Sequence, residues 1–235
     1  SCLIANDGQY LVGSDLSGIE DSTKRHYICK YDPQYVEEMN KPDFDPHLDI
    51  AMLAGFLTQE QVDNHKKGIE SHKVIRQRAK TVNFSATYKV GAETLSRNSG
   101  LKLAEAKKIL EIYWKRNKAI LDVENSLQVK EIQGQKWLLN PVSKFWYTLR
   151  AEKDKFSTLN QGTAVYVFDK WLMQIRKQGI KISYQCHDEW LGNVSAKADT
   201  KLKIKNAVDK VNEELKLNVT IGCSVDFGKT YANCH

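Results

Sequence analysis

Apolar and polar positions alternate along both ends of the chain, as they do in half-buried strands. The segment YLVGSD (10–15) predicts a short strand that ends on the carboxylate of Asp15. Near the other end, ISYQCHDEWLGNV (182–194) predicts a hairpin of two strands with Asp188 at its turn. The alternating residues of 219–225 predict a last strand: Val219, Ile221, Cys223 and Val225.

Between these ends, apolar residues recur every three or four positions, which is typical of helices. We expect helices over 48–57, 73–88 and 101–123, a long helix with an apolar stripe of Val165, Phe168, Leu172 and Ile175 that ends at Gly179, and another helix from Ile204 to Leu215. Strands at both ends of a helical middle predict an α+β fold. A sheet-based subdomain would be interrupted by a helical one.

Composition narrows the class of protein. The chain has 235 residues, 41% hydrophobic and 27% charged, so it has enough apolar residues for a folded core, and disorder is not expected. It has no apolar run long enough for a membrane span and no signal-peptide pattern, so we expect a non-secreted cytoplasmic protein. Its five scattered cysteines form no C-x-x-C pair and are interpreted as reduced thiols. A net charge of +6 favours polyanionic partners without specifying one.

Two carboxylates stand at predicted strand ends, Asp15 and Asp188. Carboxylates from separate strands of one sheet can hold two divalent ions about 3.5–4 Å apart, an arrangement that activates an attacking oxygen and stabilises a leaving one. Magnesium prefers such oxygen ligands. The alternative is that each is a solvated turn aspartate.

The predicted helix over 73–88 carries two cations followed by two aromatic rings at four-residue spacing: Arg76, Lys80, Phe84 and Tyr88. Residues four apart on a helix are neighbours on one face, and this stripe is about 18 Å long. The cations could bind a triphosphate and the rings a base and sugar. The alternative is a solvated basic face with both rings turned to the core.

Two other groups of residues are weaker candidates for a catalytic or metal site. Cys186, His187 and Asp188 cannot form a catalytic relay because consecutive strand residues point to opposite faces. The acidic loop with Asp43, Asp45, His47 and Asp49 has metal-ligating side chains. Acidic residues in a proline-flanked loop more commonly cap a helix or remain solvated.

Taken in order, four segments resemble the motifs of family A DNA polymerases, the bacterial polymerase I and phage replicase type: DLSGIE (15–20), RQRAKTVNFSATY (76–88), QGTA (161–164) and HDE (187–189). DFDPHLDIA (43–51) and the terminal YANCH (231–235) resemble other segments of the family. The resemblance implies an antiparallel palm sheet with helices, interrupted by a mostly helical fingers subdomain. The expected parts are palm (1–40), fingers (41–155) and palm again (156–235).

The resemblance also implies a role for each matching residue. Asp15 and Asp188 would be catalytic ligands of two Mg²⁺ ions, with Glu189 beside them and His187 near the primer end. Glu20, helped by Tyr88, would be a steric gate against ribonucleotides. Arg76 and Lys80 would hold the triphosphate, Phe84 would contact the nucleotide sugar, and Gln161 would contact the primer–template.

Several positions depart from the family pattern. Asp21 and Ser22 replace the usual leucine and arginine of the first motif, and Ser157 replaces an asparagine. Ser85 and Lys89 stand where glycines usually flank the fingers tyrosine. Lys89 affects the expected template contact most, because a long cation there could crowd or grip the template.

The first hypothesis is therefore a DNA polymerase that extends a primer with deoxynucleoside triphosphates. An alternative is a non-catalytic DNA-binding or assembly subunit with a polymerase fold, and another is a single-subunit RNA polymerase, which would lack a glutamate at the position of Glu20. The family's thumb and first palm strands would precede Ser1. We therefore expect an upstream polypeptide partner that supplies them.

Overall fold

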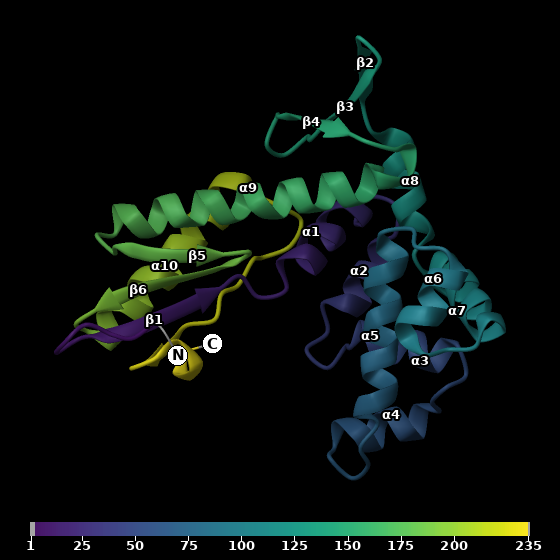
Figure 1. Ribbon diagram of the computed structural model, residues 1–235, viewed down its shortest axis with the longest axis horizontal. Helices are drawn as coiled ribbons and strands as arrows, with labels where there is room; N and C mark the ends of the chain where they lie inside the picture. The colour runs from purple at the N-terminus through teal and green to yellow at the C-terminus, as the bar shows by residue number, and fades with distance from the viewer. Residues whose placement is uncertain (1–2, 235) are drawn as a thin grey trace. The chain divides into compact units, whose positions relative to one another are not determined.

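The computed structural model describes residues 3–234, which divide into two compact units (Figure 1). The sheet unit comprises residues 1–27, 140–147 and 159–235, and the helical unit comprises residues 28–139 and 148–158. The combination of helices with antiparallel strands confirms the predicted α+β class. Over residues 3–234, no helix combines the length and apolar character needed to cross a membrane.

The sheet unit contains a four-stranded antiparallel sheet in the order β5-β6-β1-β7. Its strands are β1 (Tyr10–Asp15), β5 (Ile182–Cys186), β6 (Glu189–Val194) and β7 (Asp226–Gly228). The helices that belong to it wholly or in part are α1 (Ile19–Ile28), α9 (Lys155–Lys177) and α10 (Lys197–Leu215). The strand at 10–15 and the hairpin at 182–194 agree with the sequence predictions.

Each face of this sheet is covered by a different part of the chain. On one face, the ring of Trp190 in β6 packs edge-on against Trp171 of α9, with ring centroids 6.2 Å apart. The indole of Trp171 also donates a hydrogen bond to the carbonyl of Ile204 in α10. On the other face, Leu11 and Leu191 form a buried cluster with Cys234 near the C-terminus. The sheet is therefore held between two long helices and the C-terminal segment.

The helical unit is built from short helices: α2 (Pro33–Met39), α3 (Pro46–Leu53), α4 (Gln59–Lys66), α5 (Lys73–Thr87), α6 (Ala92–Ser99), α7 (Leu103–Arg116) and α8 (Lys118–Ser126). A small sheet has the order β2-β3-β4, with strands β2 (Val129–Ile132), β3 (Gln135–Leu139) and β4 (Trp146–Leu149). The chain passes between the two units within α1, at the end of β3, within β4 and within α9.

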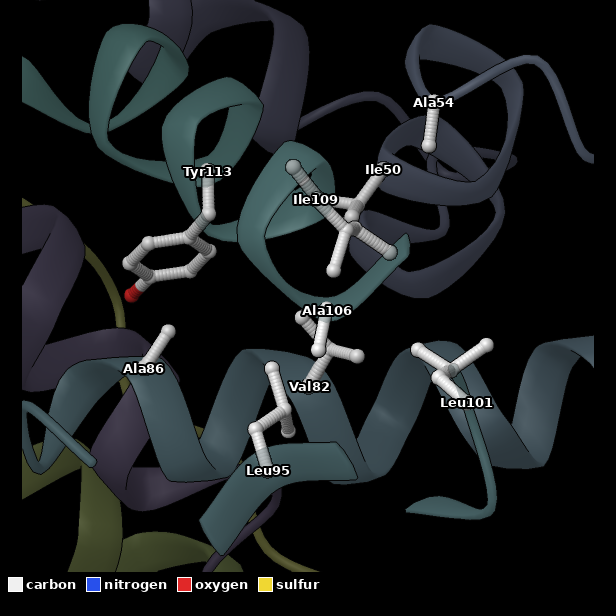
Figure 2. Close-up of a cluster of buried hydrophobic side chains, with 9 residues drawn as sticks. All are labelled: Ile50, Ala54, Val82, Ala86, Leu95, Leu101, Ala106, Ile109 and Tyr113. Atoms are coloured by element: carbon white, nitrogen blue, oxygen red, sulfur yellow. The ribbon is translucent and has the colours of Figure 1, made fainter. Parts of the chain in front are cut away.

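A buried cluster joins α3, α5, α6 and α7, as Figure 2 shows. Val82 and Ala86 of α5 face Ile109 and Tyr113 of α7, and all four side chains are fully or almost fully buried. Removing this much apolar surface from water is the main stabilising term for α5. The core thus fixes one side of α5 and leaves its other side for the polar and aromatic residues of the predicted stripe.

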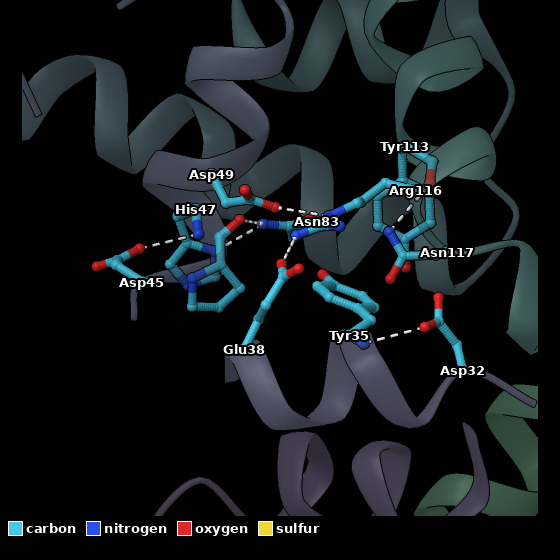
Figure 3. Close-up of polar contacts among 11 residues, drawn as sticks. Asp32, Tyr35, Glu38, Asp45, His47, Asp49, Asn83, Tyr113, Arg116 and Asn117 are labelled. Atoms are coloured by element: carbon cyan, nitrogen blue, oxygen red, sulfur yellow. Dashed lines mark hydrogen bonds and ion pairs between the residues drawn. The ribbon is translucent and has the colours of Figure 1, made fainter. Parts of the chain in front are cut away.

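Arg116 makes a second set of contacts in the helical unit (Figure 3). It pairs with Glu38 of α2 and, at 3.1 Å, with Asp49 of α3, while its guanidinium lies 4.1 Å from the ring centroid of Tyr35. One cation therefore ties the end of α7 to α2 and α3.

Three sequence predictions were wrong in detail. The helix predicted over 101–123 is two helices, α7 and α8, because the chain turns at Asn117, whose side-chain amide bonds the carbonyl of Tyr113. Val165 is exposed, so it does not belong to the buried stripe of α9. The strand predicted over 219–225 is absent apart from a single bridge between Cys223 and Leu16.

The segment 219–225 keeps the burial alternation of a strand only over 219–222, where Val219 and Ile221 are buried, and the backbone groups of Ile221 bond to a side chain and not to a strand. The side chain of Asn212 in α10 bonds both the N–H and the carbonyl of Ile221, at 2.8 and 2.9 Å. The backbone N–H and carbonyl of Ile221 are therefore satisfied without a neighbouring strand. Among the described residues, Cys29, Cys186, Cys223 and Cys234 are free thiols, in agreement with the sequence interpretation, whereas Cys2 and His235 lie outside them.

Candidate functional site

Asp15 and Glu189 are opposite partners in the β1–β6 ladder. Directly opposed residues of an antiparallel pair project to the same face of the sheet. The two carboxylates therefore share the face that also carries Leu11 and Leu191. The strand predicted over 10–15 placed Asp15 at a strand end, and the ladder shows that Glu189 lies opposite it.

His187 and Asp188 form the two-residue turn between β5 and β6, closed by the pairing of Cys186 with Glu189. His187 has a φ of 53°, the left-handed conformation that two-residue hairpin turns commonly require. The carbonyl of Asp188 accepts a hydrogen bond of 3.3 Å from the N–H of Leu16, the residue after Asp15. The turn is thereby attached to the end of β1.

These residues line one pocket of about 430 Å³ in the sheet unit. Its carboxylate-bearing residues are Asp15, Asp188, Glu189 and Asp226. His187 and Ser224 also line it. The structure therefore brings four of the predicted site residues together and adds Asp226 and Ser224, which the sequence did not indicate.

Ser224 holds Asp15 from two sides. Its hydroxyl donates to the carboxylate of Asp15, and its backbone N–H donates to the Asp15 carbonyl at 3.0 Å. The neighbouring thiol of Cys223 has its pKa raised to about 11, mainly by burial, with Asp209 and Asp15 adding to the rise against the opposing effect of Lys205. Cys223 is therefore a protonated, inert thiol near neutral pH.

The C-terminal turn at Tyr231–Asn233 forms another wall of the pocket. The phenol of Tyr231 donates to Oε2 of Glu189 at 3.1 Å. Burial and this carboxylate raise the pKa of Tyr231, so it remains a donor. A Cβ on Gly13 would lie 2.0 Å from the carbonyl oxygen of Cys234, so the strand needs glycine where the C-terminal segment crosses it.

The donor atoms of this pocket are mostly carboxylate oxygens, which suit a hard divalent cation. Within residues 3–234, no three acidic, histidine or cysteine side chains are gathered as a complete ligand set. Magnesium typically takes only one or two protein carboxylates and completes its shell with water and substrate phosphates. The pocket fits that mode of binding.

Glu20 and Gln161 are linked through Asn160. Glu20 lies in the first turn of α1, and its carbonyl accepts a hydrogen bond of 2.9 Å from the side chain of Asn160. The Asn160 side chain also accepts from the hydroxyl of Thr23 at 2.8 Å. Gln161 is the next residue of α9 and is exposed. The first turn of α1 and the second turn of α9 are thus joined next to Glu20 and Gln161.

The predicted stripe of cations and rings lies on α5. The ammonium of Lys80 is 5.8 Å from the ring centroid of Phe84, and Phe84 is 45% exposed, which excludes the alternative that this ring faces the core. Tyr88 is the C-cap of the helix. Arg76 donates from Nε to Oδ2 of Asp45 at 2.6 Å.

The acidic loop before α3 caps a helix, as the sequence interpretation favoured. Oδ1 of Asp45 accepts from the N–H groups of His47 and Leu48, at 2.8 and 3.0 Å. Burial raises the pKa of Asp45, but the hydrogen bonds from Arg76 and the two backbone N–H groups outweigh it, and the net pKa is lowered. The sequence interpretation did not identify Asp45 as the partner of Arg76.

His47 lies beside the stripe. The amide nitrogen of Asn83 donates to Nδ1 of His47 at 2.8 Å (Figure 3). The centroid of the His47 ring is 6.2 Å from that of the Phe84 ring. An imidazole that accepts at Nδ1 carries its proton on Nε2 when neutral, so it presents a donor there. The sequence signals for this residue were the segment DFDPHLDIA and its place among the metal-ligating side chains of the acidic loop.

The site residues therefore form two groups, one in each unit. The sheet unit holds Asp15, Glu20, Gln161, His187, Asp188 and Glu189, and the helical unit holds Arg76, Lys80, Phe84 and Tyr88.

The chain is similar to known polymerases over almost its whole length. The sequence profile of DNA polymerase family A matches residues 1–233. DNA polymerase I of Deinococcus radiodurans is 26% identical over 243 residues, which cover 97% of this chain and 24% of that protein. DNA polymerase I of Helicobacter pylori strain J99 is 25% identical over 209 residues, which cover 83% of this chain and 22% of that protein.

A solved structure has the same fold. It is described as the POL domain of Pol1 from M. smegmatis in complex with DNA primer-template and dNTP, and it superposes with a TM-score of 0.72 at 21% identity. The match covers 99% of this chain and 42% of that one. The chain thus spans about a quarter of the length of the curated relatives, at 24% and 22%.

Proposed function

The chain belongs to DNA polymerase family A, and on that premise we propose that it is the catalytic portion of a template-directed DNA polymerase. The sheet unit would be the palm and the helical unit the fingers. The observation that best supports catalysis is the pocket that Asp15, Asp188 and Glu189 line together at adjoining ends of β1 and the β5–β6 hairpin.

Asp15 and Asp188 are the residues that would hold two Mg²⁺ ions. When bound there, divalent ions would activate the attacking oxygen and stabilise the leaving one. The chain's own contribution is to fix the carboxylates. Ser224 orients Asp15 by two hydrogen bonds, and the hairpin turn fixes the backbone of Asp188.

The remaining residues of the palm would position the primer terminus and select the sugar. Glu20 would occupy the space that a ribose 2′-hydroxyl needs, and its backbone is held by Asn160. Gln161, exposed on the next position of α9, would contact the primer–template, and His187 in the hairpin turn would lie near the primer end.

The fingers would bind the incoming deoxynucleoside triphosphate along α5. Arg76 is bonded through Nε to Asp45, which fixes the guanidinium plane while its terminal nitrogens can bond phosphate oxygens. Lys80 would supply a point charge, and Phe84 would contact the sugar with its exposed ring. Tyr88 would assist Glu20 in excluding ribonucleotides. His47 would donate an additional hydrogen bond to a phosphate oxygen from its Nε2.

The reaction would be attack of the primer 3′-hydroxyl on the α-phosphate, with release of pyrophosphate. An upstream polypeptide would supply the thumb and the first palm strands, since the curated relatives are about four times as long as the match, which covers 24% of one of them. DNA as substrate would place the protein in the cytoplasm, that of a bacterial host if the gene is carried by a phage.

Primer extension on defined templates tests this function. The chain, alone and mixed with the upstream part, is given a labelled primer–template and one deoxynucleotide at a time. We expect incorporation only of the nucleotide complementary to the template base, and only with the upstream part present. DNA binding without incorporation under both conditions would instead support a non-catalytic subunit.

A further inference from the structure

Lys89 occupies a backbone conformation that favours glycine. It follows Tyr88, the C-cap of α5, with a φ of 51°. Its N–H bonds the carbonyl of Ala86 at 2.8 Å, and the N–H of Val90 bonds that of Ser85 at 3.0 Å. These two bonds form a Schellman motif, in which the left-handed position is usually glycine. A lysine here is strained, and a contact that glycine cannot make would have to offset that strain.

The side chain of Lys89 makes that contribution through Glu124. Its ammonium lies 2.5 Å from Oε2 of Glu124 and 5.8 Å from the ring centroid of Trp114. Glu124 in α8 is only 7% exposed, and a buried carboxylate needs a partner charge. Lys89 is that partner. The side chain is therefore directed into the helical unit.

The same carboxylate also binds the start of α9. Oε1 of Glu124 accepts the backbone N–H of Phe156 at 3.2 Å, in the first turn of that helix. One buried glutamate thus joins three elements of the helical unit: the end of α5, α8 and the N-terminus of α9. Lys89, which contributes the α5 end of this junction, directly follows Tyr88.

We propose that Lys89 is a positioning residue for nucleotide binding, which fixes Tyr88 at the end of α5 through its ion pair with Glu124. This assignment rests on the proposed function, because Tyr88 matters only if α5 binds the nucleotide. Without the ammonium, the buried carboxylate loses its counter-charge and the end of α5 loses one of its attachments, while Ala86 and Thr87 keep their contacts with α7. Tyr88 then occupies its position for a smaller fraction of the time, which raises the KM for nucleotide.

The test separates the ion pair from the backbone conformation. Lys89→Gly accepts the positive φ without strain and removes only the side chain, while Lys89→Arg keeps the charge. Lys136→Met is a matched control, because Lys136 also pairs with a glutamate of the helical unit, Glu152 at 2.6 Å, but at an exposed site. KM and kcat for each deoxynucleotide are measured in the complete polymerase, together with the urea midpoint of unfolding.

We expect Lys89→Gly to raise KM about tenfold with kcat within about twofold, while Lys89→Arg and Lys136→Met stay near the unsubstituted protein. If Lys89→Gly does not fold, Glu124→Gln serves instead, since its amide oxygen can still accept from Phe156 and the same rise in KM is expected. A lower urea midpoint with unchanged KM would overturn the assignment and leave Lys89 with a purely structural role. Failure of Lys89→Arg to restore KM would also overturn it.

The outcomes also separate this inference from the proposed function. If the unsubstituted polymerase extends primers and Lys80→Ala raises KM while Lys89→Gly does not, only the positioning role is wrong. If the unsubstituted polymerase extends no primer, both are wrong.

Discussion

The phenol of Tyr231 donates a hydrogen bond of 3.1 Å to the carboxylate of Glu189. The two residues are 42 positions apart in the sequence, and the bond attaches the C-terminal turn to the strand that carries the candidate catalytic hairpin. Because Glu189 lies opposite Asp15 in the ladder, the C-terminal turn helps to define the candidate catalytic pocket.

Tyr231→Phe should slow primer extension by about three- to tenfold, because the ring still packs but the carboxylate of Glu189 loses a fixed donor. Single-turnover extension rates measure the effect. Tyr10→Phe is the control, since Tyr10 lies in β1 of the same sheet and loses the same hydroxyl. Equal rates for the two variants would contradict a role for the Tyr231 hydroxyl.

Glu20→Ala should weaken the rejection of ribonucleotides, because removal of the side chain opens space at the sugar 2′ position. The ratio of kcat/KM for a deoxynucleotide to that for its ribonucleotide should fall by about tenfold or more. Competition assays on one template measure it. An unchanged ratio would rule out a gate at this position.

Lys80→Ala should raise the KM for nucleotide about tenfold or slow the chemistry, because a cation near the triphosphate is lost. Steady-state extension at varied nucleotide concentration separates the two effects, and the Kd for primer–template is measured alongside. If only the affinity for DNA falls, Lys80 binds the DNA backbone instead.

Asp45→Asn should reduce stability at pH 7 but not in strong acid. Asparagine can still cap α3, so the substitution removes mainly the charge that pairs with Arg76. The native pKa of Asp45 is lowered, so its contribution is complete above the unfolded value of 3.8 and is lost as the pH falls through the native value. The difference at pH 7 should be about 0.5–1 kcal/mol, since the pair is partly exposed.

Urea unfolding of both proteins between pH 7 and pH 2 measures this dependence. The two curves of stability against pH should converge below the native pKa of Asp45. A difference that stays constant to pH 2 would show that the carboxylate charge is not what stabilises α3 and α5.

The sequence predicted those helices and strands whose burial pattern and turn residues are visible within a few neighbouring positions. The β5–β6 hairpin and β1 were predicted because alternation and turn residues are local signals, and α5 was predicted because its apolar positions repeat along one face. Short helices such as α2, α4 and α6 were missed. Each has only seven or eight residues, and burial by neighbouring elements stabilises them more than their own pattern.

The features that sequence could not supply depend on contacts between distant residues. The side chain of Asn212 bonds the backbone N–H and carbonyl of Ile221 in place of a neighbouring strand. The spacing of apolar residues does not indicate such a contact. Ser224 and Tyr231 reach the pocket only because the C-terminal segment crosses β1 at Gly13. The resemblance to a family indicated Asp15 and Asp188 by their motifs, whereas Ser224 lies outside every matching segment and YANCH (231–235) implied no role for Tyr231.

Primer extension by the Asp188→Ala protein, with binding of the same primer–template measured in parallel, tests whether the pocket of Asp15, Asp188 and Glu189 is the catalytic site. Nucleotide addition should fall by at least about a thousandfold while the Kd for DNA changes by less than about threefold, because the lost carboxylate would hold metal and not duplex. Substantial extension by the Asp188→Ala protein would contradict the claim that this pocket is the catalytic site.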